Sequence, residues 1–238
     1  MSENITVIPL TNLSIIFIPV SLVVVILYRW SLEWKKSIYG IFRMVLQLLL
    51  IGYFLSYIFG SKESLIIIST LCIMVFIASW IALGTISNER KSLFKYALIS
   101  IVIGGGSILI LVSQLVLKLD PWYLPQYMIP IAGMIFASSM NGVSLAGERL
   151  IAELNRENDY TTAKSIALRA ALIPITNSLF AVGLVSLPGM MTGQILSGIS
   201  PLIAVRYQVM VMCMIFSAVG LSSFLFLSMI QLKVKSKA

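Results

Sequence analysis

The residues best suited to chemistry lie in one stretch near the end of the chain, residues 183–208, which reads GLVSLPGMMTGQILSGISPLIAVRYQ. Pro188-Gly189 interrupts an apolar helix there, and a second break falls at residues 198–201. Interrupted backbone between membrane helices is tolerated only where protein buries it or where it lines a wet cavity. We therefore take this stretch as the first candidate for a working site.

The side chains of this stretch include soft sulfurs, amides and one cation. Met190 and Met191 carry thioethers that suit a soft metal, but methionine more often fills space between helices, and both interpretations stay open. The other candidates for a substrate pathway here are Pro188, Gly189, Gln194, Arg206 and Gln208.

Polar residues inside apolar segments add candidates, because a charge at the centre of a membrane helix costs roughly 2.5–3.5 kcal/mol on insertion. Arg43 has Gln47 on the same helix face; it either extends to the headgroups or points with Gln47 into the bundle. Asn141 either packs closely or faces the interior. Asn177 follows Pro174, which kinks its helix, so a place on a pathway is one interpretation.

Small residues mark two sites of close helix packing. Residues 137–142 read ASSMNG, a composition typical of membrane helices in close contact. Gly104-Gly105-Gly106 lies in an apolar segment and lacks the Lys and Ser/Thr of a phosphate-binding loop. We expect a packing or hinge site there.

Missing residue types narrow the chemistry. The chain has no histidine, and all nine acidic residues fall in loops or in the leader. A histidine-ligated metal site is excluded, and an aspartyl protease or a carboxylate-driven proton carrier is disfavoured. No nucleotide motif is present. We therefore predict no enzyme and no cofactor on this chain, and no particular metal ligand is indicated.

The overall composition indicates that membrane helices hold these candidate residues in place. The 238 residues are 59% hydrophobic and 11% charged, with a mean hydropathy of +1.00, whereas soluble domains carry about 25% charged residues. This composition predicts an all-α, multi-pass membrane protein. The net charge of +8 is spread over small groups, so nucleic acid is not the expected partner. Cys72 and Cys213 lie in apolar segments and are expected to be reduced and buried.

Seven apolar segments are long enough to cross about 30 Å of hydrocarbon. They are residues 9–28, 38–59, 64–84, 96–117, 123–146, 167–187 and 207–230. Thirteen of the seventeen Lys and Arg residues fall on one side of this arrangement, which predicts an outer N-terminus and a cytoplasmic C-terminus. Residues 189–205 would then be re-entrant or lie at the outer face, and residues 1–238 form one integral membrane domain.

The longest polar segment, residues 147–169, is predicted to be a cytoplasmic helical hairpin. Arg149, Glu153 and Glu157 share one helix face, and Thr161 or Thr162 can cap the second helix. The hairpin is either simply solvated or a docking element for a cytoplasmic partner. The residues expected to couple to that partner are Glu148, Arg149, Glu153, Arg156 and Asp159.

Three stretches carry a family resemblance. They are MIPIAGMIFASSMNGVSLAGERL (128–150), LIPITNSLFAVGLVSLPGMMTGQILSGISPLIAVRYQ (172–208), and the RMVLQLLLIG pattern from Arg43 to Gly52. Together they resemble the FetB-like family of ABC-transporter permeases, whose bacterial members are associated with iron export and whose plant relatives are linked to aluminium tolerance. The resemblance covers most of the chain.

The resemblance implies a permease paired with a separate ATP-binding subunit, which would hold ATP and Mg, as two permeases and two ATPases. Residues 147–169 would be the coupling segment, and its movement would expose a cavity near Arg43, Gln47, Asn141 and Asn177. The lack of carboxylates is awkward for a bare Fe³⁺ ion. Freed backbone carbonyls or a complexed, even anionic, metal would resolve this. A stand-alone channel or secondary carrier for a small polar or anionic solute, and a non-transporting scaffold, are the alternatives.

Overall fold

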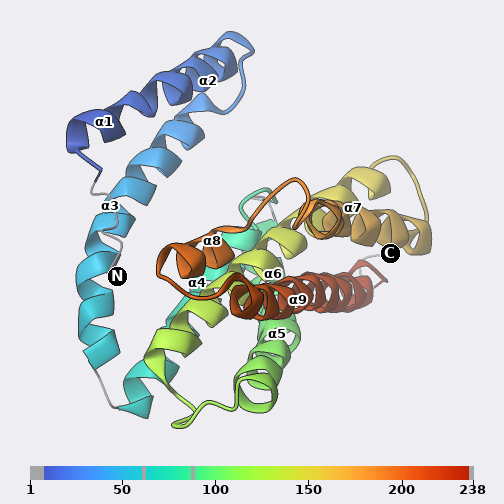
Figure 1. Ribbon diagram of the computed structural model, residues 1–238. Coiled ribbons are helices and arrows are strands. Elements are labelled where there is room, and N and C mark those ends of the chain that lie inside the picture. Colours follow the sequence, from blue (N-terminus) through green and yellow to red (C-terminus); the bar gives the residue numbers. More distant parts are fainter. Residues whose placement is uncertain (1–7, 61–62, 87–88, 236–238) are drawn as a thin grey trace. The chain divides into compact units, whose positions relative to one another are not determined.

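The computed structural model describes residues 8–60, 63–86 and 89–235 and is helical almost throughout (Figure 1). Apart from an isolated bridge between Val182 and Ser186, these residues form no β-structure. The all-α prediction is therefore confirmed. In chain order the elements are α1 (Leu10–Ile15), α2 (Phe17–Arg29), α3 (Trp34–Gly60), α4 (Ser64–Ala82), α5 (Arg90–Ile110), the π-helical turn η2 (Leu111–Val116), α6 (Pro125–Leu154), α7 (Tyr160–Ala181), α8 (Gly189–Leu196) and α9 (Pro201–Lys235).

Six stretches of the described chain are long and apolar enough to cross a membrane. They are Leu10–Arg29, Trp34–Gly60, Ser64–Ala82, Arg90–Val116, Pro125–Leu154 and Pro201–Gln231. They correspond to six of the seven predicted crossings, and α7 is the helix that is not among them. The multi-pass helical architecture is confirmed, whereas the count of seven and the orientation of the termini stay predictions.

The chain divides into two compact units, residues 1–61 and 62–238, and each is described by itself. The prediction of a single domain therefore stays a prediction. In the first unit α2 packs against α3, and neither α1 nor α2 contains a buried residue. Apolar side chains such as Phe42, Leu49 and Tyr53 of α3 are exposed. Such a surface suits lipid or another membrane helix rather than water.

The second unit has its core where α5 and α6 cross α9. A Cβ atom added to Gly104 of α5 would lie 2.7 Å from the Ser222 backbone nitrogen of α9, so only glycine permits this approach. Gly142 of α6 lies as close to Ser223 and Val219. Ser222 donates a 3.1 Å hydrogen bond to Ser139 within this contact, and both are fully buried. The predicted close packing is thus confirmed, although Gly106 of the same glycine run meets open space.

The two cysteines differ from the prediction. Both are free thiols, but Cys72 on α4 and Cys213 on α9 are exposed rather than buried. The physical reason is that a membrane helix can present apolar residues to lipid as readily as to the protein core. An apolar sequence neighbourhood therefore does not distinguish the two faces.

Candidate functional site

The broken stretch forms two turns around one short helix. The chain leaves α7 at Ala181, turns through Gly183 at a φ of +85°, and enters α8 from an extended Pro188. A second turn at Gly198, also at a φ of +85°, leads to Pro201 at the start of α9. Both predicted breaks are confirmed. The eight residues of α8 extend over about 12 Å, too little to cross a bilayer.

Arg206 and Gln208 lie within α9 rather than at its mouth, because the helix begins six residues earlier than the predicted segment. Proline is favoured in the first turn of a helix, where its missing N–H costs no hydrogen bond, and Pro201 occupies that place. Arg206 is exposed. Met190 and Met191 are half-buried on α8, and Pro188 and Gly189 form the start of that helix.

Two glutamine oxygens, one on α8 and one on α9, are buried without a hydrogen-bond partner in the described part of the chain. Gln208 on α9 is only 5% exposed, and its Oε1 is unpaired. Gln194 on α8 is half-buried, and its Oε1 is likewise buried and unpaired. Buried polar atoms nearly always have a partner, so unpaired oxygens indicate a place where water or a ligand can bind.

A cavity of about 330 Å³ lies between α6, α7 and α9. Its polar lining comes from Ser138 and Asn141 of α6 and from Ser178 of α7. Met212, Ile215 and Val219 of α9 form the apolar wall, packed against Ile175 of α7. Asn141 and Ser178 are exposed, so the cavity opens at the surface of this unit. Its volume falls at the lower end of the range for small-molecule sites.

The structure separates Asn177 from this cavity. Asn177 lies in a second groove of about 420 Å³, lined also by Arg169 and Thr176 of α7. Its neighbour Ser178 lines the cavity instead, because successive residues of a helix point about 100° apart. Arg43 and Gln47 belong to α3 in the first unit, the former half-buried and the latter exposed. A shared pathway of all four residues stays a prediction.

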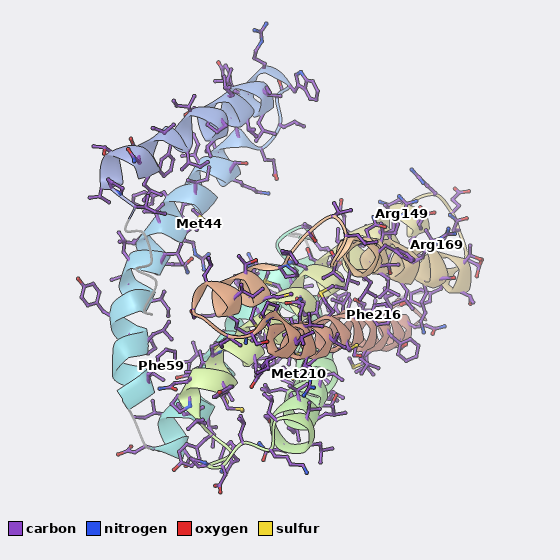
Figure 2. The ribbon with its side chains drawn as sticks, viewed as in Figure 1. Met44, Phe59, Arg149, Arg169, Met210 and Phe216 are labelled. Atoms are coloured by element: carbon purple, nitrogen blue, oxygen red, sulfur yellow. The ribbon has the colours of Figure 1, made fainter. Side chains whose placement is uncertain are left out.

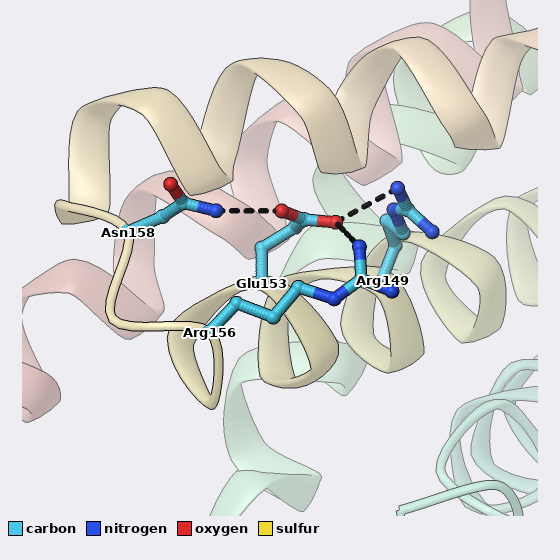
Figure 3. A network of polar contacts seen from close by, with 4 residues as sticks. All are labelled: Arg149, Glu153, Arg156 and Asn158. Atoms are coloured by element: carbon cyan, nitrogen blue, oxygen red, sulfur yellow. Dashed lines mark hydrogen bonds and ion pairs between the residues drawn. The ribbon is translucent and has the colours of Figure 1, made fainter.

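The predicted coupling segment is a tight helical hairpin centred on Glu153, as Figure 3 shows. Glu153 is 3% exposed. Its Oε1 lies 2.7 Å from Nη2 of Arg149 and 3.2 Å from Nη1 of Arg156. Its Oε2 accepts a 2.7 Å hydrogen bond from Asn158. The network ties the last turn of α6 to the following turn, because a buried carboxylate must have its oxygens satisfied.

Two details of the hairpin were predicted wrongly. Glu157 is not on the Arg149–Glu153 face, because α6 ends at Leu154 and Glu157 has a φ of +61° in the turn. The helix cap is Asp159, not a threonine: its carboxylate accepts hydrogen bonds from the backbone N–H groups of Thr161 and Thr162. The hydroxyl and N–H of Thr162 are the main causes that lower the pKa of Asp159. Glu148 is exposed near the end of α6.

The start of α7 is joined to α9 by polar contacts that sequence reasoning missed. The Tyr160 hydroxyl donates to the Leu227 carbonyl, and burial raises the pKa of this tyrosine to about 12. Lys164 donates a 2.7 Å hydrogen bond to Ser228 and lies over the Phe224 ring. Figure 2 shows Arg149 and Arg169 at the hairpin and Met210 and Phe216 along α9. No sequence spacing relates residues 160 and 227, so this junction was not predictable.

The donor set of the site is neutral. Within the described residues there is no group of three or more His, Cys, Asp or Glu side chains that could hold a metal ion. Met212 and Met214 are buried in the core, as expected of methionines that pack. What the cavity offers a ligand is hydroxyl and amide groups with one thioether.

These features define the class of protein. Six stretches of the described chain are long and apolar enough to cross a membrane, and small residues pack the helices of the second unit closely, so the chain is a multi-pass helical membrane protein. Residues 10–234 match the model of the uncharacterised protein family UPF0014. The chain belongs to the UPF0014 family.

Three relatives are similar along most of their length. A UPF0014 membrane protein of Synechocystis is 38% identical over 73% of both chains. The probable iron export permease protein FetB of Escherichia coli is 34% identical, over 89% of this chain and 86% of FetB. Protein ALUMINUM SENSITIVE 3 of Arabidopsis thaliana is 33% identical, over 86% of this chain and 79% of its own. The resemblance inferred from the motifs is confirmed. No solved structure matches the chain.

Proposed function

We propose that this chain is the membrane-spanning permease subunit of an ATP-binding cassette transporter that exports iron or another metal species from the cytoplasm. The observation that carries the proposal is the similarity to a probable iron export permease over 86% of that protein's length. A permease of this kind contains no ATPase of its own, so ATP and Mg would bind to a separate subunit.

The hairpin of α6 and α7 is the part suited to that partner. Arg149 and Arg156 keep side-chain exposures of 42% and 65% while one buried glutamate orients both. Such a preorganised pair can bind acidic groups without a further loss of side-chain freedom. The contacts of Tyr160 and Lys164 with α9 give the hairpin a direct connection to the helix that lines the cavity.

A homodimer of permeases fits the exposure of the cavity. Asn141 and Ser178 are exposed beside apolar helices, and polar groups in a bilayer need partners. A second copy over this face would close the cavity. The transported species would then pass between α6, α7 and α9, and the α8 region would be its outer exit.

The test is co-expression with an ATP-binding cassette subunit encoded beside this chain, followed by co-purification and ATPase assay. We expect a stable complex whose ATP hydrolysis exceeds that of the free subunit. Arg156→Gln, which removes one of the two exposed cations, should weaken the complex at least several-fold. Lys91→Gln, which removes an exposed cation at the start of α5 and outside the hairpin, is the matched control.

A chain that never binds an ATP-binding subunit, yet moves solute in vesicles, would identify a channel or secondary carrier instead. A chain that does neither would be a scaffold. Equal loss of binding in Arg156→Gln and Lys91→Gln would show that the overall positive charge, rather than the hairpin, controls docking.

A further inference from the structure

The cavity between α6, α7 and α9 is polar without being charged. Ser138, Asn141 and Ser178 supply its polar atoms, and among its described lining residues none is ionisable. Its other lining side chains are aliphatic groups and one thioether, so no side chain in the cavity could pair with an anion. A ligand in it would meet hydrogen-bonding groups and dispersion contacts but no counter-charge.

Unpaired oxygens extend the same face of α9 beyond both ends of the cavity. Gln208, Met212, Ile215, Val219 and Ser223 fall on one face of a helix with 3.6 residues per turn. The middle three line the cavity. Gln208, one turn before them, and Ser223, one turn after, each bury a side-chain oxygen without a hydrogen-bond partner in the described chain.

Burying these oxygens without a hydrogen-bond partner costs free energy unless a ligand binds to them. A buried polar atom without a partner loses its hydration and gains nothing in return. Gln208 is 95% removed from the surface, and replacing it by an apolar residue of similar shape would remove the cost. Its presence on the cavity face is explained if a ligand supplies the missing hydrogen bond during passage.

The absence of charge limits which ligand can do so. Transfer of an ion from water into an uncharged, membrane-embedded cavity costs far more than a few neutral hydrogen bonds return. For a neutral solute the unfavourable free energy comes only from those polar groups that stay unpaired in the cavity. The described oxygens of Gln208 and Gln194 accept hydrogen bonds, so the solute should carry donors or polarised ligand groups at its periphery.

We propose that the α6–α7–α9 cavity and the flanking Gln208 bind a charge-neutral, hydrogen-bonding solute, which for a metal means a neutral complex rather than a bare cation or an anionic chelate. This proposal rests on the proposed transport function and names its substrate class. Asn141 and Ser178 contact the solute in the cavity, and Gln208 accepts a hydrogen bond from it toward α8.

The test uses the complex of this chain with its ATP-binding partner, reconstituted in vesicles. Three forms of radioactive iron serve as probes: free Fe²⁺, anionic iron(III) citrate, and neutral iron(III) tris-acetohydroxamate. We expect ATP-dependent transport of the neutral complex at a rate at least about tenfold above the other two, because an uncompensated charge in the cavity costs more than the roughly 1.4 kcal/mol that a tenfold factor represents.

Two variants test the residues. Gln208→Met and Asn141→Leu should each lower transport of the neutral complex about tenfold. Gln126→Met makes the same change at an exposed position in the first turn of α6 and should have no effect. Gln208→Met should also leave the thermal stability of the complex unchanged or raise it, because it removes an unpaired oxygen. A residue that only supports the fold would lower stability together with transport.

The outcomes separate the two proposals. If no iron form is transported and no ATP-binding subunit associates, the proposed function fails. If the complex assembles and transports Fe²⁺ or the citrate chelate in preference to the neutral complex, the substrate class proposed here is overturned. Full transport activity in both Gln208→Met and Asn141→Leu would overturn the assignment of these residues.

Discussion

Two neighbouring serines of α6 differ in their surroundings: one is packed in a helix crossing and the other lines a cavity. Ser139 is fully buried in the crossing with α5 and α9 and is hydrogen-bonded to Ser222. Ser138 is half-buried and lines the cavity that α7 helps to form. The helices around Ser139 approach so closely that only glycine fits at the crossing, whereas the space beside Ser138 can hold a small molecule. Small residues therefore allow close helix packing on one face of α6 and leave room for a small molecule on the adjacent face.

The largest expected effect comes from a substitution that forces the closely packed helices apart. Gly104→Val would place a branched side chain where even a Cβ meets the Ser222 backbone at 2.7 Å. We expect α5 and α9 to separate, at a cost of about 3 kcal/mol or more. The measurement is the yield of monodisperse protein in detergent and its thermal midpoint. Gly106→Val is the control, because nothing lies within 4 Å of a Cβ there; equal losses in both variants would contradict the packing explanation.

Filling the open side should affect transport rather than folding. Ser138→Phe puts a ring into the cavity of about 330 Å³ without touching the Ser139–Ser222 contact. We expect at least a tenfold loss of ATP-dependent transport, since access is blocked, and a thermal midpoint close to that of the parent chain. The same vesicle assay measures it. A large loss of folded protein with Ser138→Phe would mean that this face is packed after all.

A milder change tests whether the hydroxyls of Ser138 and Ser139 contribute differently to stability. Ser139→Ala removes the hydroxyl that pairs with Ser222, and we expect a loss of about 1 kcal/mol, as for an ordinary hydrogen bond between membrane helices. Ser138→Ala should change stability by less than about 0.5 kcal/mol. Denaturant unfolding in mixed micelles compares them. Equal effects would place the two hydroxyls in equivalent surroundings.

The smallest expected effect concerns α7, the helix that closes the cavity on one side. The pKa of Asp159 is lowered from its ordinary value of 3.8, so its cap stabilises the folded form above that pH and is lost as the pH falls through the lowered value. We expect the first turn of α7 to loosen below a pH of about 4. Hydrogen exchange at Thr161 and Thr162 measures this. Asp159→Asn keeps an acceptor that does not titrate, so an equal acid response in that variant would exclude Asp159 as the cause.

Local signals predicted much of the fold. Prolines and glycines gave the breaks at Pro188 and Gly198, and small residues gave the crossing around Ser139 and Gly142, because both effects act within a few residues. The hydrophobic run did not show that α9 begins at Pro201. It also did not distinguish exposed Cys213 from buried Met214, since both faces of such a helix are apolar.

The site was only half predictable for a related reason. Asn141 and Gln208 stood out as polar residues in apolar surroundings. In the structure Asn141 lines the cavity, and the buried Oε1 of Gln208 has no hydrogen-bond partner in the described chain. Asn177 stood out as well, yet Ser178 holds the place in the cavity. Which residue of a helix faces a neighbour depends on packing between α7 and α9 through Ile175 and Val219, and single-chain spacing carries no information about that.

The length of α9 has a mechanical consequence. Its 35 residues make a rod of about 52 Å whose fulcrum is the glycine-lined crossing at Ser222. Leu227 and Ser228, held by the hairpin, lie on the short arm, and Gln208 lies on the long arm about 21 Å from the fulcrum. A swing of about 10° would carry Gln208 through about 4 Å, more than the width of a water molecule. If an ATP-binding partner pushes the hairpin, a small displacement there would be amplified into a larger one at Gln208.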